Sequence, residues 1–177
     1  MSFGFYTDGA FWIRFKDSSR VLVDKQEGDV SFTVVNNDGL VVKQYLCGTV
    51  QQFPGQVKPG PSAEISRTIT RGGTVIKNLA GDRQILLFAN GNYCVHTDDK
   101  WISTNNAGDR ICRSSTGMSN LTSVPFSNVT DPKTNISTML REDSTMRVNY
   151  PDGSINTLYG DGTCMHTYPD GKILVEA

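Results

Sequence analysis

The sequence has almost no excess of charge and no long apolar run, and both absences narrow the classes of protein that it can encode. Its 17 basic and 18 acidic residues give a net charge of -1, and neither sign forms a run. Nucleic acids and anionic membranes are bound through basic surfaces, so neither partner is expected. Apolar stretches such as Ile85 to Ala89 are far too short to span a bilayer. No charged, apolar and small-residue leader opens the chain, so a secretory signal is not expected.

The residues that metal sites use are scarce. The chain has two histidines and four cysteines, and no C-x-x-C pair. The pairs Cys94-Val-His96 and Cys164-Met-His166 offer four side chains of the types that zinc accepts, because residues two apart on a strand share a face. Strand-borne pairs lack the turn geometry of common structural zinc sites, so we expect them to pack in the interior. We therefore expect neither a metal nor another cofactor.

Catalytic motifs are absent as well. No G-x-S-x-G or H-E-x-x-H motif gives either histidine a role. Asp98 and Asp99 follow His96, and a solvated loop beside Trp101 accounts for them. Gly72-Gly73 lies between expected strands and is followed by no helix, so it is not a phosphate-binding loop. We expect no enzyme, no catalytic residue and no small-molecule ligand.

One alternative remains open from the cysteines and from three N-x-[ST] sequons. The sequons at Asn120, Asn128 and Asn135 lie in one Ser/Thr-rich stretch. An extracellular, glycosylated binding domain with paired cysteines would use both features. Irregular cysteine spacing in a chain of this length favours reduced thiols in an intracellular protein instead.

What the sequence does contain is a short repeat of tyrosine followed by Asp-Gly. Tyr150-Pro-Asp-Gly153, Tyr159-Gly-Asp-Gly162 and Tyr168-Pro-Asp-Gly171 begin nine residues apart. Asp-Gly between apolar alternations is a strong hairpin signal, because a type I′ turn needs positive φ at both central residues. We therefore predict two-residue turns, in which Pro151 pairs with Ser154 and Tyr150 with Ile155.

Two-residue turns with a nine-residue period would keep all three tyrosines on one face of the sheet. The face predicted to be apolar and rich in tyrosine comprises Met146, Val148, Tyr150, Ile155, Thr157, Tyr159, Cys164, His166, Tyr168, Ile173 and Val175. The face predicted to be mostly polar comprises Arg147, Asn149, Ser154, Asn156, Leu158, Thr163, Met165, Lys172 and Glu176.

Further copies of the unit extend the prediction over most of the chain. They are Tyr6-Thr-Asp8-Gly9, Phe15-Lys-Asp17-Ser18 and Phe88-Ala-Asn90-Gly91, the last of which is expected to place Leu86, Phe88, Tyr93 and Val95 on one face. The sequence thus predicts an all-β fold, an antiparallel meander of short hairpins that forms a sheet or a sandwich with little helix.

We expect three segments. Residues 1–111 form a β-rich segment, with a Gly/Pro loop over 47–63 and room for a short helical turn over 62–68. Residues 112–137 form a Ser/Thr/Pro-rich connection or an extended strand along the sheet edge. Residues 138–177 form the tandem repeat, packed with residues 1–111 as one domain.

Aromatic side chains are the best candidates for contact with a partner. Stacking on single-stranded nucleic acid would need a basic groove around them. Tyr and Trp are enriched at protein interfaces because they bury a large area around a polar group. We therefore predict protein-binding roles for Trp12, Tyr150, Tyr159 and Tyr168.

The ordered combination of several motifs resembles the sperm-associated antigen 17 family. The motifs are Thr130-Asp-Pro132, Arg141-Glu-Asp143, Tyr150-Pro-Asp-Gly-Ser154 and Tyr159-Gly-Asp-Gly-Thr163, with a weaker similarity over Ile69 to Asn92. The resemblance implies a scaffold subunit of a central-pair projection in the axoneme of motile cilia and flagella. It implies a cytoplasmic, cytoskeletal location and binding to other axonemal proteins.

Two other families share parts of the pattern. The tandem Tyr-x-Asp-Gly hairpins resemble the centriolar G-box proteins, in which a free-standing sheet binds a partner peptide. Residues 4–45 are similar to a polo box through Thr7-Asp-Gly-Ala10 and Phe15 to Arg20, although a Gly/Pro loop follows here where a polo box has a long helix. Both imply a centriolar or peptide-binding module, and all the resemblances imply binding without chemistry.

Overall fold

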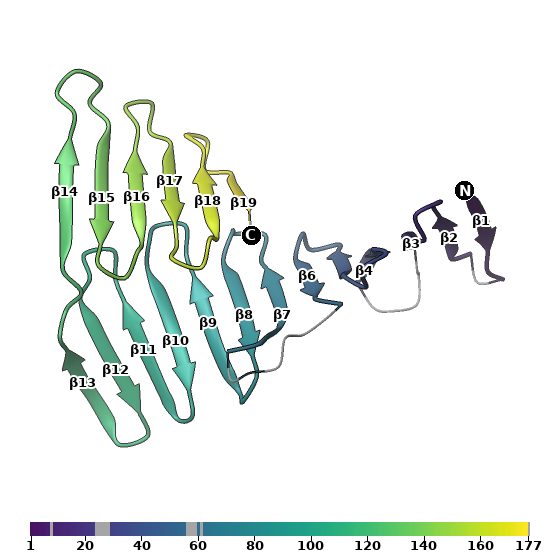
Figure 1. Cartoon of the computed structure of the whole chain (residues 1–177), viewed down its shortest axis with the longest axis horizontal. Helices are drawn as coiled ribbons and strands as arrows, with labels where there is room; N and C mark the ends of the chain where they lie inside the picture. The colour runs from purple at the N-terminus through teal and green to yellow at the C-terminus, as the bar shows by residue number, and fades with distance from the viewer. Residues whose placement is uncertain (8, 24–28, 56–59, 61, 177) are drawn as a thin grey trace. The chain divides into compact units, whose positions relative to one another are not determined.

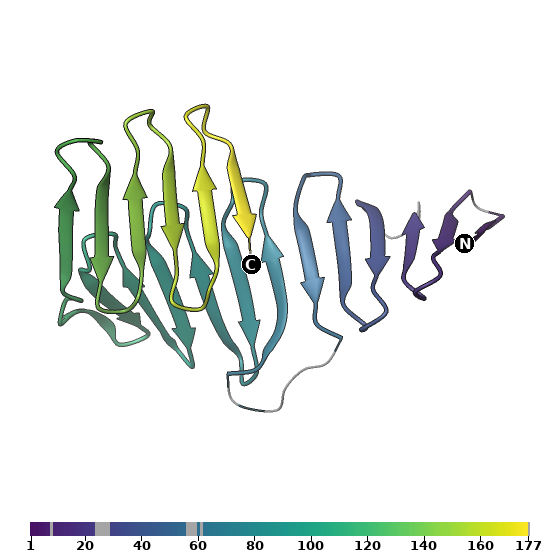
Figure 2. The same ribbon diagram turned by 45° about the horizontal axis from the view of Figure 1, so that its top comes forward.

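The computed structural model describes residues 1–7, 9–23, 29–55, 60 and 62–176. All regular structure in these residues is β-strand, and each strand pairs antiparallel with the next along the chain, in two sheets (Figures 1 and 2). The predicted all-β antiparallel meander is therefore confirmed. The described part of the chain has no helix of the length and apolarity that crossing a membrane requires.

The chain divides into two compact units, residues 1–71 with 76–82 and residues 72–75 with 83–177. The first eight strands are β1 (Ser2–Phe5), β2 (Phe11–Arg14), β3 (Arg20–Val23), β4 (Val30–Val35), β5 (Val41–Tyr45), β6 (Val50–Phe53), β7 (Glu64–Ile69) and β8 (Val75–Leu79). The second unit holds β9 (Arg83–Leu87), β10 (Tyr93–Thr97), β11 (Lys100–Thr104), β12 (Arg110–Ser114), β13 (Gly117–Leu121), β14 (Phe126–Thr130), β15 (Ser137–Arg141), β16 (Met146–Asn149), β17 (Ile155–Leu158), β18 (Cys164–Thr167) and β19 (Ile173–Glu176).

The repeated turns contain three residues, and the prediction of two-residue type I′ turns is wrong. Tyr150 N–H donates to the Ser154 carbonyl at 3.0 Å, and Gly153 N–H donates to the Tyr150 carbonyl at 3.0 Å. Gly153 has a φ of +87°, whereas Asp152 is not among the residues with positive φ. This combination is a type I turn followed by a left-handed glycine. Asp152 Oδ1 accepts the Ser154 N–H at 2.9 Å and closes the turn.

The longer turn shifts the register by one residue and sorts the repeat onto two faces. Asn149 pairs with Ile155, not Tyr150 with Ile155 as predicted. Paired residue numbers therefore add up to an even number, so even-numbered residues of β15 to β19 share one face. Because the repeat is nine residues long, an even-numbered residue in one copy is equivalent to an odd-numbered residue in the next. Equivalent residues of successive units thus point to opposite faces of the sheet.

The same correction applies to the turn at residues 88–91. Tyr93 pairs with Leu87 and Val95 with Ile85, so these four share a face, and Leu86 lies on the opposite one. Among the earlier copies, the one that begins at Phe15 has the same three-residue turn, because the Phe15 N–H donates to the Ser19 carbonyl at 2.8 Å. The predicted Asp8 of the first copy lies outside the described residues.

In unit 2, strands β15 to β19 of the six-stranded sheet pack their odd-numbered side against β9 to β13 and their turns (Figure 2). The chain passes from β13 to β14 through a tight crossing, where Val124 N–H donates to the Gly108 carbonyl at 2.8 Å. The fully buried side chains of the six-stranded sheet are all odd-numbered; they are Arg141, Thr145, Thr157, Thr163 and Met165. The core of unit 2 therefore lies on this inner face.

Strands also occupy segments expected to be irregular. Residues 112–137 contain β13 and β14, and the expected loop over 47–63 contains β6, with Pro59 and Pro61 outside the described residues. The helical turn expected over 62–68 is replaced by β7. The division into the three expected segments, with residues 138–177 packed on residues 1–111 as one domain, stays a prediction.

Candidate functional site

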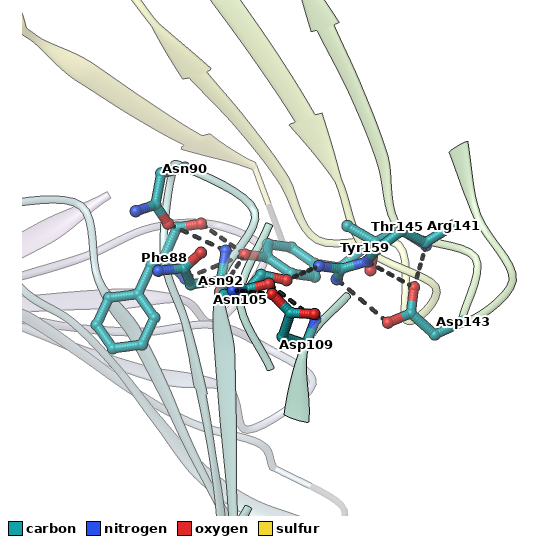
Figure 3. A network of polar contacts seen from close by, with 9 residues as sticks. All are labelled: Phe88, Asn90, Asn92, Asn105, Asp109, Arg141, Asp143, Thr145 and Tyr159. Carbon is teal, nitrogen blue, oxygen red and sulfur yellow. Dashed lines mark hydrogen bonds and ion pairs between the residues drawn. The ribbon is translucent and has the colours of Figure 1, made fainter. Parts of the chain in front are cut away.

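Tyr159 is built into the core between the two sheets of unit 2, with 4% of its surface exposed (Figure 3). Its hydroxyl lies 2.5 Å from the Phe88 carbonyl and 2.6 Å from the Asn92 carbonyl, and it accepts the Phe88 N–H at 3.2 Å. Thr157 Oγ1 donates to the neighbouring Ala89 carbonyl at 2.7 Å. Burial raises the pKa of the Tyr159 hydroxyl well above its usual value. Tyr159 therefore joins β17 to the turn between β9 and β10.

Arg141 makes a second link between the same sheets (Figure 3). Its Nη1 donates to the Asn105 carbonyl at 2.5 Å, and its guanidinium carbon lies 5.5 Å from the centre of the Tyr93 ring. Its Nη2 lies 3.2 Å from Asp143 Oδ2. Partial burial raises the pKa of Asp143, but the Thr145 N–H and Arg141 together outweigh it and leave the pKa below its usual value. A buried charge is tolerated here because it is paired and hydrogen-bonded.

The opposite face of the six-stranded sheet, which holds the even-numbered residues of β15 to β19, is open and carries apolar side chains in register. We call it the outer face. Leu140 pairs with Met146, Met146 with Leu158, and Leu158 with Cys164. These four side chains form an apolar row that crosses four adjacent strands. Leu140 is 50% exposed and Leu158 37% exposed. Contiguous exposed apolar surface of this kind marks sites of protein contact.

A mixed row with Asn156 and His166 at its centre runs beside the apolar row. Val148 pairs with Asn156, Asn156 with His166, and His166 with Leu174. The Asn156 amide donates to the Tyr150 hydroxyl at 3.1 Å, and its carbonyl contacts His166 Nδ1. This row supplies hydrogen-bonding groups next to the apolar surface.

Tyr150 and Tyr168 border the outer face, whereas Tyr159 points to the inner face. The ring of Tyr168 packs edge-on against His166 at 4.4 Å, and Tyr168 is 42% exposed. A depression of about 280 Å³ lies there, lined by Asn156, Cys164, His166, Tyr168, Leu174 and Glu176. Of the three tyrosines predicted to share a face, the structure thus brings two together.

Trp12 lies on β2 in unit 1, far in the sequence from the three tyrosines of the repeat. Its indole lies flat over Gly4, where a Cβ would come within 2.8 Å of Nε1. Trp12 pairs with Leu22 on β3, and Arg14 pairs with Arg20. A groove of about 490 Å³ is lined by Tyr6, Trp12, Arg14, Ser18, Arg20, Leu22, Val35, Asn36 and Asn37.

The two C-x-H pairs lie on faces that point away from each other. Cys94 and His96 are on the side of β10 opposite Tyr93, whose ring contacts Arg141 of the other sheet. His96 stacks on Trp101 with ring centres 4.5 Å apart. Cys164 and His166 are on the outer face. The geometry does not bring the four side chains to one zinc site, and no three His, Cys, Asp or Glu side chains of the described residues gather as a metal site would need.

The three sequon asparagines are exposed, and the four cysteines form no disulfide. Asn120 lies on β13, Asn128 on β14 and Asn135 in the turn that follows, and all are exposed. Cys47, Cys94, Cys112 and Cys164 are free. The glycosylated extracellular domain stays an alternative.

Sequence reasoning missed the aliphatic part of the outer face. Leu158 is predicted on the polar face, but it shares the outer face with Met146 and Cys164. Leu140 and Leu174 lie outside the predicted face altogether. The missed signal is Pro151, which has no N–H to give to the hydrogen-bonded pair that a two-residue hairpin would require of it.

No protein-family model and no characterised protein sequence matches the chain. Among solved structures, the TCP10 domain of Danio rerio CPAP in complex with a peptide of Danio rerio STIL is similar in fold. It has a TM-score of 0.53 and 17% sequence identity, over 99% of this chain and 93% of that chain. The same domain without the peptide gives a TM-score of 0.53 and 16% identity, over 96% of this chain and 84% of that chain. The chain thus has a TCP10-like fold.

Proposed function

We propose that the chain is a non-enzymatic docking module that binds an extended peptide of a partner protein across its outer face. The observation that carries the proposal is the apolar row of Leu140, Met146, Leu158 and Cys164, which crosses four strands and has Leu140 and Leu158 exposed. Peptide binding suits this surface, because apolar ligand side chains cover the row while Asn156 and His166 offer hydrogen bonds beside it.

The partner is proposed to be of the centriolar kind. The TCP10 domain of Danio rerio CPAP, which has a similar fold, is seen with a bound peptide of STIL. This likeness supports the centriolar peptide-binding alternative raised by the tandem hairpins. On this proposal Tyr150 and Tyr168 contact the ligand at the border of the outer face, and Tyr159 acts inside the fold. Trp12 is proposed as a contact for a separate ligand segment in the unit 1 groove.

A fluorescence titration with the STIL peptide tests the docking face. Leu158→Lys places an ammonium group in the centre of the apolar row, where a bound peptide would desolvate it. We expect at least a tenfold weaker Kd, which corresponds to about 1.4 kcal/mol. Met118→Lys is the matched control, because Met118 is also an exposed apolar residue of unit 2 but lies on β13. Absence of binding by the natural chain, or equal binding by Leu158→Lys, would contradict the proposal.

The axonemal scaffold implied by residues 130–170 is the second candidate for the setting. Capture of proteins from an extract of ciliated cells separates the two settings, with the natural chain and Leu158→Lys compared side by side. Centriolar proteins that are lost with Leu158→Lys support the first setting. Central-pair proteins that are lost in the same way support the second. Proteins that both chains retain equally do not use the outer face.

A further inference from the structure

Unit 1 carries a second apolar surface, which we call the phenylalanine face. The register of β1 to β5 puts two rows of apolar side chains on one side of the sheet. The first row is Phe3, Ile13, Val21, Val34 and Val42. The second row is Phe5, Phe11, Val23 and Phe32.

The opposite side of the same strands is of mixed character. Leu22 and Trp12 are apolar there, but Arg14, Arg20 and Lys43 are charged. On the phenylalanine face of β1 to β5 there is no charged side chain among the described residues. The sheet therefore has one side suited to water and one suited to burial.

Nothing in the described part of unit 1 covers the phenylalanine face. The unit consists of one sheet, and Phe5 remains 74% exposed. Phe3 and Phe5 pack against each other edge-on with ring centres 6.1 Å apart. Packing another sheet face to face is the usual way for such a surface to leave water.

We propose that a second copy of the chain covers this face, with the two sheets packed face to face about a two-fold axis. An uncharged face such as this one can meet its own copy without repulsion between like charges. Five strands about 4.8 Å apart and two side-chain rows would bury on the order of 600 Å² per copy. The total of about 1,200 Å² is at the lower end of specific interfaces, so the dimer is a weak one.

Sedimentation equilibrium of the full chain over a range of concentrations tests the dimer. The natural chain dimerises as its concentration rises. Val21→Lys puts a charge in the centre of the face and raises the dimer Kd at least tenfold. Leu22→Lys is the matched control, because Leu22 is the next residue of β3 and lies on the other side of the sheet. It leaves the dimer Kd within a factor of three.

Three results would overturn the proposal: a natural chain that stays monomeric at all concentrations, a dimer that persists in Val21→Lys, or equal weakening by both lysine variants. The double variant Phe3→Ser, Phe5→Ser provides a test that does not depend on folding of Val21→Lys, since both rings are largely exposed. It leaves the backbone of the edge strand β1 unchanged. A dimer that survives it unweakened is paired through its edges and contradicts a face-to-face contact.

Discussion

At the scale of single residues, Tyr159 carries more of the structure than its counterparts in the repeat. Its ring is buried and its hydroxyl lies among three backbone groups of the turn at residues 88–92. Tyr168 holds the same place in the next nine-residue copy but is 42% exposed. The same position of the repeat is thus buried in one nine-residue copy and partly exposed in the next.

Removal of the Tyr159 hydroxyl should destabilise unit 2. Tyr159→Phe removes the hydrogen bonds of this hydroxyl, while the Phe88 N–H keeps the Asn92 carbonyl as its acceptor and the Phe88 carbonyl keeps the Gly91 N–H as its donor. We therefore expect a loss of about 0.5–1.5 kcal/mol in the free energy of unfolding. Urea unfolding followed by circular dichroism measures the loss. Tyr168→Phe is the control and should change stability by less than about 0.5 kcal/mol. Equal effects of the two variants would show that the link through Tyr159 contributes nothing.

Asp143 makes part of the stability depend on pH. Its pKa in the folded state lies below the ordinary value of 3.8. The ionised form is therefore favoured by folding, and this contribution is fully present above the unfolded pKa and is lost as the pH falls through the lowered folded pKa. We expect Asp143→Asn to flatten the fall in melting temperature between pH 5 and acid pH, as measured by differential scanning calorimetry. The exposed neighbour Glu142 supplies the control, Glu142→Gln, and an unchanged acid profile in Asp143→Asn would contradict this role.

At the scale of the element, the three-residue turn is the unit that builds the sheets. Its second residue, usually Asp or Asn, accepts the N–H two residues later, as at Asp17, Asn90, Asp143, Asp161 and Asp170. Its third residue is left-handed. Gly usually fills the third place, but Ser18 and Ser144 do so with φ of 70° and 65°.

Exchange of glycine at this third place should move stability in a direction set by the backbone. Gly153→Ala adds a Cβ that meets nothing within 4 Å, so its cost of about 1 kcal/mol comes from the positive φ alone. Ser18→Gly relieves the same strain and should stabilise the chain by a few tenths of a kcal/mol to about 1 kcal/mol. Thermal unfolding of both variants checks the two signs. A stabilising Gly153→Ala would mean that the turn is not left-handed at this residue.

The sequence is sufficient to predict the hairpins and insufficient to predict their register. Asp-Gly at a nine-residue spacing predicts hairpins whether the turn has two residues or three. Pro151 decides between them, because proline is favoured at the first central position of a type I turn and cannot donate within a ladder. Strands β13 and β14 have no such marker, since Ser, Thr and Asn are as common in turns as in edge strands. The sequence therefore predicts a connection or one extended strand along the sheet edge in their place.

At the scale of the whole molecule, the wrong prediction of the strand register also makes part of the site prediction wrong. Tyr150 and Tyr168 could be proposed from residue type alone, and they do lie on one face. The apolar row could not be proposed, because a shift of one residue moves Leu158 from one face to the other. A correct site prediction therefore requires the turn length to be known first.

The outer face and the phenylalanine face lie in different units of the molecule. The outer face belongs to unit 2 and is proposed to take a peptide, whereas the phenylalanine face belongs to unit 1 and is proposed to meet a second copy. Because the faces share no residue, Leu158→Lys should leave dimerisation unchanged and Val21→Lys should leave peptide affinity unchanged. Loss of both activities in either variant would indicate unfolding, and the double Phe variant then separates the two functions.

Methyl NMR of the whole chain, titrated with the peptide probe of the binding experiment, tests the docking face most directly. If the peptide binds across the outer face, the methyl signals of Leu140, Met146 and Leu158 shift together as the peptide is added. The signals of Ile155 and Met165, which lie on the inner face, should stay in place. Shifts confined to the inner face or to unit 1, or no shifts at all, would contradict the account.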